Sequence, residues 1–447
     1  MIEKCLHRGH LNSRLRHKSS SVNPNFHAVY IAILSAIIAF PAIAANNDFI
    51  VYTGQEGSIA GNSYDNTLDA DISIADGNTL NIVGRTVKNT ISDTDTSLEG
   101  VFNTFAIKNF DNHTLEVGAG ANLFIQGGTT FYITLQYVDE KGEQASHEIP
   151  AKGIYGLSVG NGKIINNGEM TVTSGYCDYT NGIENLATAG TKAEIVNNAR
   201  LTLFGGGVSK SQADLGLKGA YAMNNMAYGE AAEATLRNSG TLLIQGGETS
   251  FRYGIQTLAY SESDAESVKA TKGTLTNTGT VQIVGGSALN AVGIFAFASG
   301  SKAQALVENQ SSSKEGIQIV GGSRFEHDEA IEKAAYGVYA FAINGGQATF
   351  TNQKNASTSI KGGSGAHAHG VNTISKQASS NSLLQNFGTL QIIGGTEENA
   401  HGIYAVSTEE ASATLKISDP TALLLVRGGG NNLANGIHSF AREGGGE

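Results

Sequence analysis

The sequence is poor in cysteine, proline, tryptophan and charge. It has two cysteines, four prolines and no tryptophan in 447 residues, and 15% of its residues are charged. Cys5 lies in the N-terminal segment that we interpret below as a removed leader, which leaves Cys177 alone. We therefore expect no intramolecular disulfide and interpret Cys177 as a small buried hydrophobe. A hydrophobic fraction of 40% excludes a disordered chain. Beyond the first 44 residues there is no Lys/Arg-rich stretch, which argues against a nucleic acid partner.

The first 44 residues differ in kind from the rest. Basic residues precede an apolar run over residues 28–40, and small residues surround Ala44. This order is typical of a secretory signal peptide. The run is shorter than the roughly 20 apolar residues that span a bilayer, although a retained N-terminal anchor is the alternative. We expect residues 1–44 to be a signal peptide, with cleavage after Ala44 or after Ala45.

Glycine is abundant, with 57 residues, and much of it falls in a repeated phrase. An apolar strand pattern runs into a pair of glycines, as in Leu242-Leu243-Ile244-Gln245-Gly246-Gly247. From Gly205 onward the first glycine of each pair recurs after 41, 39, 36, 41, 32 and 34 residues. A fixed period of this size indicates a repeat architecture.

Two further phrases complete the repeat. The second begins with glycine and alternates large with small residues, as in Gly293-Ile294-Phe295-Ala296-Phe297-Ala298. The third ends in asparagine and often continues into Gly-Thr, as in Leu236-Arg237-Asn238-Ser239-Gly240-Thr241. Each phrase is typical of a strand with one buried face. We expect polar surface insertions between the second and third phrases, such as residues 260–272.

Three short strands cannot close a core alone, so the repeats must stack. The sequence predicts an all-β fold, a right-handed parallel β-helix of about 35-residue, three-strand repeats. A propeller is the alternative, but its blades need four antiparallel strands. We expect repeats over residues 116–447 and an N-terminal cap with degenerate first coils over residues 45–115, in which residues 74–84 look like one degenerate repeat.

The leader, the repeated Asn-x-Gly-Thr-Leu-x-Ile-x-Gly-Gly pattern and the near absence of cysteine resemble autotransporter passenger domains of type V secretion. The resemblance covers residues 116–447 well and residues 45–115 poorly. It implies a β-helix displayed at the bacterial surface, with adhesion or cell aggregation as its function. It also implies a surface protein or glycan of a host cell or bacterium as partner.

Autotransporters end in a membrane barrel, and the sequence up to Glu447 has no run of alternating membrane strands. Its last repeat stops after Phe440-Ala441. If the complete chain carries a barrel, we expect it at the cell surface or secreted. If it ends at Glu447, we expect a truncated periplasmic product.

The repeated asparagines fall at matching places, and we interpret them as a hydrogen-bonded structural ladder that also tolerates left-handed corners. They are Asn166, Asn197, Asn238, Asn277, Asn309, Asn352 and Asn386.

Four histidines lie near the second phrase: His367, His369, His401 and His438. Stacked repeats place His369 and His401 about 4.8 Å apart in the column of Tyr253, Val292 and Tyr336. No carboxylate recurs with them, so we interpret the column as a surface stripe and expect neither a metal nor a cofactor.

We predict no enzymatic activity and no catalytic residues. The Gly-Asp-Ser-Gly motif of secreted serine proteases is missing, and Gly362-Gly363-Ser364-Gly365-Ala366 lacks the final glycine of a nucleophile elbow. A polysaccharide-acting β-helix enzyme is the alternative function, and a nonfunctional remnant is a third. Such an enzyme needs paired carboxylates on adjacent strands, whereas the acids gather in predicted loops. They are Glu262, Asp264, Glu266, Glu326, Asp328 and Glu329.

Overall fold

The computed structural model describes most of the chain from residue 51 onward. The chain divides into two units, Met1–Asn47 and Asp48–Glu447, and all described residues belong to the second. The predicted signal peptide and its cleavage site lie outside the described residues. These are residues 51–53, 63–64, 71–83, 86–92, 103–107, 112–127, 129–138, 144–149, 154–174, 180–205, 220–246, 251–261, 269–285, 287–288, 290–324, 334–364, 367–396, 399–430 and 434–442.

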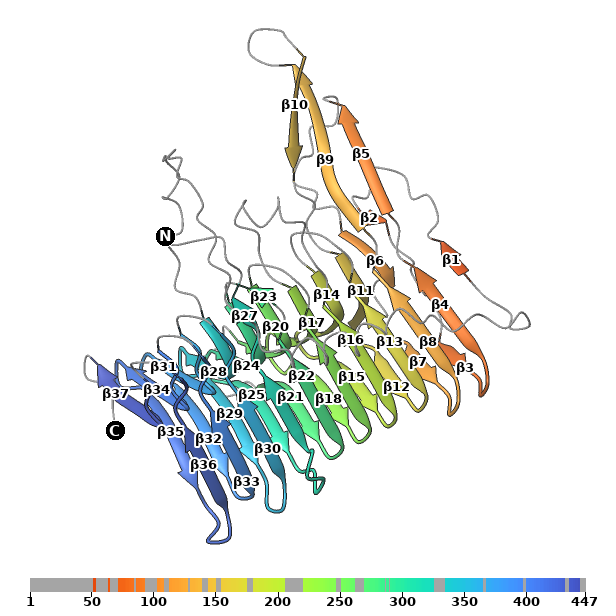
Figure 1. Ribbon diagram of the computed structural model, residues 1–447. Helices are drawn as coiled ribbons and strands as arrows, with labels where there is room; N and C mark the ends of the chain where they lie inside the picture. The colour runs from red at the N-terminus through yellow and green to blue at the C-terminus, as the bar shows by residue number, and fades with distance from the viewer. Residues whose placement is uncertain are drawn as a thin grey trace, which may run out of the picture. The chain divides into compact units, whose positions relative to one another are not determined.

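Every element in these ranges is a β-strand, and nearly all belong to three long parallel sheets (Figure 1). Sheet 1 holds the first phrase of each repeat: β1 (Val51–Thr53), β4 (Thr79–Val83), β8 (Asn122–Gln126), β13 (Glu169–Thr173), β16 (Arg200–Phe204), β19 (Thr241–Gln245), β22 (Thr280–Val284), β26 (Ile317–Val320), β30 (Ser357–Lys361), β33 (Thr389–Ile393) and β36 (Leu423–Arg427).

Sheet 2 holds the second phrase: β2 (Ser63–Tyr64), β6 (Asn103–Ile107), β11 (Ile154–Gly160), β14 (Thr180–Ala187), β17 (Ala220–Tyr228), β20 (Phe251–Tyr260), β24 (Asn290–Ser299), β28 (Ala334–Ile343), β31 (Val371–Lys376), β34 (Ile403–Thr408) and β37 (Ile437–Arg442). Sheet 3 holds the third: β3 (Ile72–Ile74), β7 (Thr114–Val117), β12 (Lys163–Asn166), β15 (Lys192–Asn197), β18 (Glu233–Asn238), β21 (Thr271–Asn277), β25 (Ala303–Asn309), β29 (Gln347–Asn352), β32 (Asn381–Asn386) and β35 (Ser412–Ile417).

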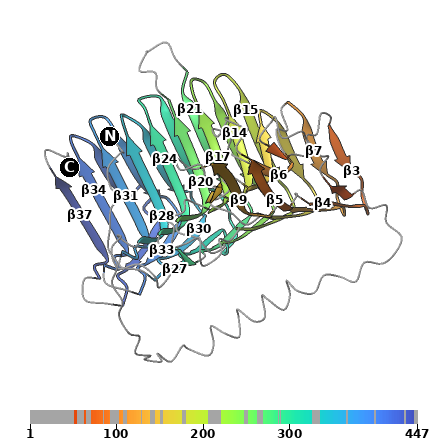
Figure 2. The same cartoon turned by 90° about the horizontal axis from the view of Figure 1, so that it is seen from above.

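One strand from each sheet makes one rung, and successive rungs pair in parallel. In sheet 1, Leu201 pairs with Leu242, Leu242 with Val281, and Val281 with Ile317. Figure 2 shows the strands of sheet 2 side by side in chain order. The predicted parallel β-helix of three-strand repeats is confirmed.

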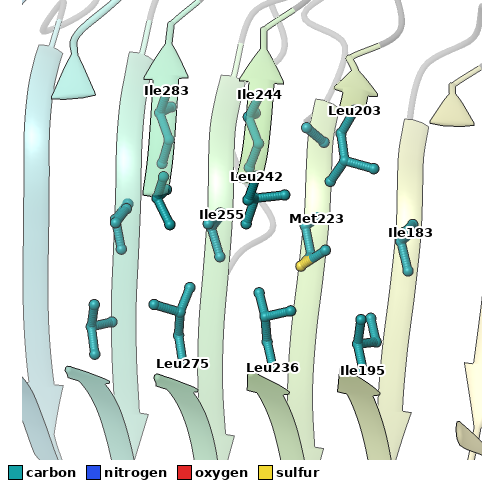
Figure 3. Packing of buried hydrophobic residues seen from close by; sticks show 14 of the residues in the cluster. Ile183, Ile195, Leu203, Met223, Leu236, Leu242, Ile244, Ile255, Leu275 and Ile283 are labelled. Carbon is teal, nitrogen blue, oxygen red and sulfur yellow. The ribbon is translucent and has the colours of Figure 1, made fainter. Parts of the chain in front are cut away.

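The core lies between the three sheets and is continuous from rung to rung. Along most described strands of sheets 1 and 3, buried and more exposed positions alternate, because successive side chains point to opposite faces. Leu236 of one rung and Leu242, Ile255 and Leu275 of the next point inward together (Figure 3). Burial of such side chains stabilises the fold by about 1.5–3 kcal/mol each.

The glycine that opens the second phrase is required by close packing. A Cβ on Gly293 would lie 2.2 Å from Ile319 Cγ2 and 2.6 Å from the carbonyl oxygen of Gly337. Gly337 meets Ile360 Cγ2 and the Gly370 carbonyl in the same way, at 2.3 and 2.7 Å. No side chain larger than hydrogen fits where the first and second strands of neighbouring rungs meet.

The long connections lie mostly between sheets 1 and 2, which corrects the predicted position of the insertions. The corner between sheets 2 and 3 is short in most described rungs, as at residues 229–232 and 344–346. Ala187, Ala193 and Ala227 pack together beside this corner. The connection over residues 261–270 is the long exception that the sequence did indicate.

Two smaller sheets accompany the connections from sheet 1 to sheet 2. In the larger, β9 (Thr129–Val138) pairs antiparallel with β10 (Gln144–Ile149) and parallel with β5 (Thr86–Ser92). In the smaller, β23 (Ser287–Ala288) pairs with β27 (Ser323–Arg324).

The first coils already follow the rule of the later ones. The segment expected to be one degenerate repeat, residues 74–84, contains the last residue of β3 in sheet 3 and the whole of β4 in sheet 1. Ile74, Leu80 and Ile82 join the same core as the later rungs.

Candidate functional site

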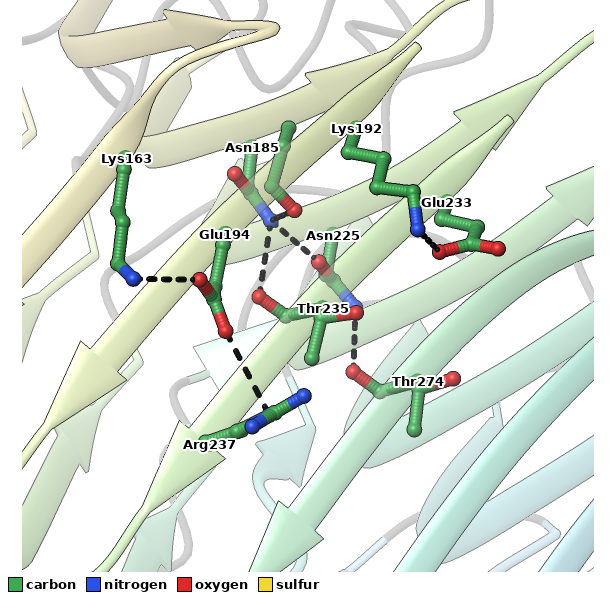
Figure 4. A network of polar contacts seen from close by, with 10 residues as sticks. Lys163, Asn185, Lys192, Glu194, Asn225, Glu233, Thr235, Arg237 and Thr274 are labelled. Atoms are coloured by element: carbon green, nitrogen blue, oxygen red, sulfur yellow. Dashed lines mark hydrogen bonds and ion pairs between the residues drawn. The ribbon is translucent and has the colours of Figure 1, made fainter. Parts of the chain in front are cut away.

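The outer faces of the three sheets differ in chemistry. Sheet 3 carries charged pairs between neighbouring strands. Lys163 Nζ lies 2.9 Å from Glu194 Oε2, and Lys192 Nζ lies 2.7 Å from Glu233 Oε2 (Figure 4). Arg237 Nε lies 3.5 Å from the other oxygen of Glu194. These pairs face solvent and contribute at most about 1 kcal/mol each.

Sheet 1 presents a largely uncharged outer face. Along one column, Gln282 pairs with Gln318 in the next rung, then come Ser359 and Gln391. These side chains carry hydroxyl or carboxamide groups, which fits a solvated surface.

Sheet 2 is different because aromatic rings stack along its outer face. The ring centroids of Tyr221 and Tyr253, of Tyr253 and Phe295, and of Phe295 and Tyr339 each lie 5.0 Å apart. A parallel column joins Phe297 to Phe341 at 5.5 Å. From Tyr221 to Tyr339 the rings stack face to face, since the planes of successive rings differ by at most 29°.

The centre of this aromatic column is buried. Phe295 is 9% exposed. Burial raises the pKa of the Tyr253 and Tyr339 phenols, with a smaller contribution from neighbouring tyrosines. Both phenols therefore remain neutral and are poor candidates for proton transfer at neutral pH.

The histidines continue the aromatic column toward the last rungs, as their positions in the sequence predicted. The Tyr336 ring stacks on His369 at 5.3 Å, and His369 stacks on His401 at 5.1 Å. His438 follows at 4.8 Å from His401 with a tilted ring. Tyr253, Val292 and Tyr336 pair in register, so the predicted column is confirmed.

The histidines are not a surface stripe, and this expectation was wrong. His369 is 2% exposed and His401 is 4% exposed. The Nδ1 atom of His369 accepts a hydrogen bond from the His401 backbone N–H at 3.3 Å, and His401 Nδ1 accepts one from Asn435 N–H at 3.1 Å. These bonds need an unprotonated Nδ1, so both rings are neutral with the proton on Nε2.

Burial, followed by the fields of His401, His367 and His438, lowers the pKa of His369 to about 3. Burial, followed by the fields of His438 and His367, lowers the pKa of His401. The described residues contain no group of three or more His, Cys, Asp or Glu side chains placed to hold one metal ion. The histidines with lowered pKa values therefore belong to a packed column, and no carboxylate is among the groups that shift their pKa.

The asparagine ladder is confirmed as a structural feature. Asn166 Nδ2 donates to Asn197 Oδ1 at 2.7 Å, and the same bond recurs up to Asn352 and Asn386 at 2.9 Å. All seven side chains are buried. The expected left-handed corner was wrong: none has a positive φ, because each ends a strand of sheet 3 with its side chain turned inward.

The remaining catalytic candidates lie mostly outside the described residues. Cys177 and the acidic loop residues, Glu262, Asp264, Glu266, Glu326, Asp328 and Glu329, belong to this group, as do Gly365 and Ala366. Ser364 is described, and its backbone N–H donates to the Gly322 carbonyl at 3.0 Å in an ordinary connection between rungs.

Sequence reasoning missed a hollow at the corner between sheets 2 and 3. It has a volume of about 560 Å³ and is lined by Tyr260, Ser261, Ser299, Asn344 and Gln377. The sequence held one signal for it. The position that is tyrosine in β17 and β20 becomes serine in β24, which removes a large ring from the column.

Comparison with known proteins adds no relative. No family model matches the chain, and neither a curated protein nor a solved structure is significantly similar to it. In the part of the chain that the structure describes, no helix is long and apolar enough to cross a membrane.

Proposed function

We propose that this chain is the exported passenger of an autotransporter-like protein and acts in adhesion or cell aggregation at the bacterial surface. The resemblance of its leader and repeats to such passengers motivates the proposal. The fold supports it, because a stack of rungs repeats each surface group at a fixed spacing, which favours many weak contacts made together.

The supporting observation is the contrast between the three outer faces. Sheet 2 carries stacked aromatic rings, sheet 3 carries charged pairs, and sheet 1 mixes polar side chains with exposed apolar ones such as Phe124 and Val284. Tyr228 and Phe440 of sheet 2 are exposed. Aromatic side chains are enriched where proteins bind other proteins and ligands, because they bury a large area with little loss of conformational entropy.

Expression of the full gene in a Gram-negative host tests the proposal. We expect the mature chain to be cut by external protease on intact cells, and we expect these cells to settle or to adhere to host cells faster than cells with an empty vector. The Tyr228→Ser/Phe440→Ser variant should adhere less. Gln282→Ser/Gln318→Ser, on the outer face of sheet 1, is the matched control and should adhere like the wild type.

Two outcomes would contradict the proposal. Retention of the chain inside intact cells, out of reach of the protease, would rule out surface display. Surface display with no gain in adhesion or settling would leave export without the adhesive function.

A further inference from the structure

The hollow at the corner between sheets 2 and 3 spans the ends of successive strands. Tyr260 ends β20 and Ser299 ends β24, while Asn344 and Gln377 directly follow β28 and β31. Four consecutive rungs thus contribute to one wall. Its volume of about 560 Å³ falls within the roughly 300–1,000 Å³ of small-molecule sites.

The hollow exists because a column of rings stops. Tyr228 and Tyr260 pair in register, and their rings stack at 4.8 Å with planes 12° apart. The next residue of the column is Ser299. A serine occupies far less volume than a phenol, so space opens beside Tyr260 in the direction of the later rungs.

Three corners around the hollow have left-handed backbone conformations. Gly300 has φ 106°, Asn344 has φ 56° and Gln377 has φ 68°. Glycine and asparagine tolerate this region, whereas glutamine is held there at a conformational penalty. The same conformation recurs at this corner outside the described lining, at Ala231, Ser379 and Glu409, so it belongs to the corner in general. At Gln377 it places the side chain in the wall of the hollow.

The wall combines hydroxyl and carboxamide groups that already bond one another. Asn344 Nδ2 donates to Ser299 Oγ at 3.1 Å, and the Asn344 backbone N–H donates to Gln377 Oε1 at 3.2 Å. Ser261 Oγ is buried and has no hydrogen-bond partner in the structure as described.

The chemistry of the described lining indicates the class of ligand. The described lining holds no Asp, Glu, Lys, Arg or His. Hydroxyls and carboxamides both donate and accept hydrogen bonds, as sugar hydroxyls do, and a tyrosine ring offers an apolar surface for sugar C–H groups. We propose that this hollow binds a neutral saccharide, one or two sugar rings of a longer glycan.

The inference deepens the adhesive function proposed above, because it names the chemical class of one ligand and rests on that function for its biological role. Binding itself is a property of the purified chain. It can therefore be tested without reference to export or to adhesion.

The test measures binding of the purified full chain to soluble, neutral oligomers of glucose, galactose, mannose and N-acetylglucosamine, by calorimetry and saturation-transfer NMR. We expect at least one oligomer to bind, and we expect Gln377→Gly to weaken that binding at least tenfold. Glycine suits a positive φ, so this variant should keep or raise the melting temperature. Ser299→Tyr, which extends the tyrosine column into the hollow, should also abolish binding.

Glu409→Gly is the matched control. Glu409 directly follows β34 with φ 55°, at the same corner one rung further along and outside the described lining of the hollow. It should bind like the wild type. Failure of every neutral oligomer to bind, or binding that neither Gln377→Gly nor Ser299→Tyr weakens, would overturn the proposal. Saccharide binding by a chain that is never displayed on cells would uphold this inference and contradict the surface function alone.

Discussion

Asn197 Nδ2 lies 2.6 Å from Oδ1 of Asn238, a residue 41 positions further along the chain. The next steps of the ladder join residues 39, 32, 43 and 34 positions apart with the same bond. The bond forms only if each rung returns the chain to the same point, whatever length its connections have. The ladder therefore holds the register of sheet 3 and, through its bonds to the carbonyls of Thr241 and Thr280, that of sheet 1.

Replacement of Asn238 by alanine should destabilise the fold by about 1–3 kcal/mol. The change removes the donor that Asn277 Oδ1 accepts from in a buried site, and an unsatisfied buried group carries a penalty of this size. The amide of Asn197 loses one acceptor but keeps the carbonyls of Ala199 and Thr241. Chemical denaturation measures the loss, and hydrogen exchange should show it concentrated in the rungs of β15, β18 and β21.

Asn198→Ala is the control for this variant. Its amide also bonds across a rung, to Asn167 Oδ1 at 2.8 Å, but the pair is exposed and water can replace it. We expect a change within about 0.5 kcal/mol. Equal losses for both variants would show that burial of the ladder does not matter.

Replacement of Gly293 by alanine should destabilise the fold by about 2 kcal/mol or more, or prevent folding. The new methyl group would overlap Ile319 Cγ2 and the Gly337 carbonyl oxygen, and overpacking of a rigid core is costly. Gly430→Ala, where a Cβ meets nothing within 4 Å, should change little. Thermal unfolding distinguishes them, and a Gly293→Ala protein as stable as wild type would contradict the packing argument.

Acid should weaken the rungs that hold the histidine column. His369 has a pKa near 3 in the folded chain, against about 6.5 when unfolded. Above pH 6.5 the ring is neutral in both states and its packing contributes fully. Between pH 6.5 and 3 only the unfolded chain takes up the proton, so stability falls by about 1.4 kcal/mol per pH unit. Below pH 3 this residue causes no further loss.

Hydrogen exchange at pH 7 and pH 4.5 measures the effect. Amides of β31 and β34 should lose protection at pH 4.5 more than amides of β15 and β18. His369→Tyr places in this column the residue found at Tyr253 and Tyr336, and it should reduce the loss. Equal acid sensitivity along the whole chain would contradict a role for the histidines.

Core and surface substitutions in sheet 3 should separate clearly. Leu236 is fully buried, so Leu236→Ala should cost about 2–5 kcal/mol. Glu194→Gln breaks contacts to Lys163 and Arg237 at the surface and should cost less than about 1 kcal/mol. Denaturant titration gives both values, and similar losses would show that the surface pairs matter more than their exposure suggests.

The repeats could be predicted because each strand leaves a local pattern. Alternation of buried residues marks the strands, and the asparagine that ends each third phrase marks one corner. The glycine before Ile294 could be recognised from the sequence, but its reason could not, since the Cβ clash comes from Ile319 in the following rung.

The candidate sites were harder to predict because they depend on what covers a residue. The histidine column was predicted correctly by register, yet its burial was not. The hollow beside Tyr260 arises from a serine in β24 and left-handed corners after β28 and β31, which lie far apart in sequence. A glutamine in a left-handed corner has no local sequence pattern that distinguishes it from a glutamine at the end of a strand.

Because the asparagine ladder fixes the register, the number of residues in a rung does not change the distance that the rung spans along the helix axis. Residues added between sheets 1 and 2 extend the flank of the molecule and leave every other rung in place. A connection can therefore be exchanged, lengthened or lost while the faces that it borders keep their spacing. Variation under selection can act on one rung at a time, so the protein can change what it contacts without changing how it folds.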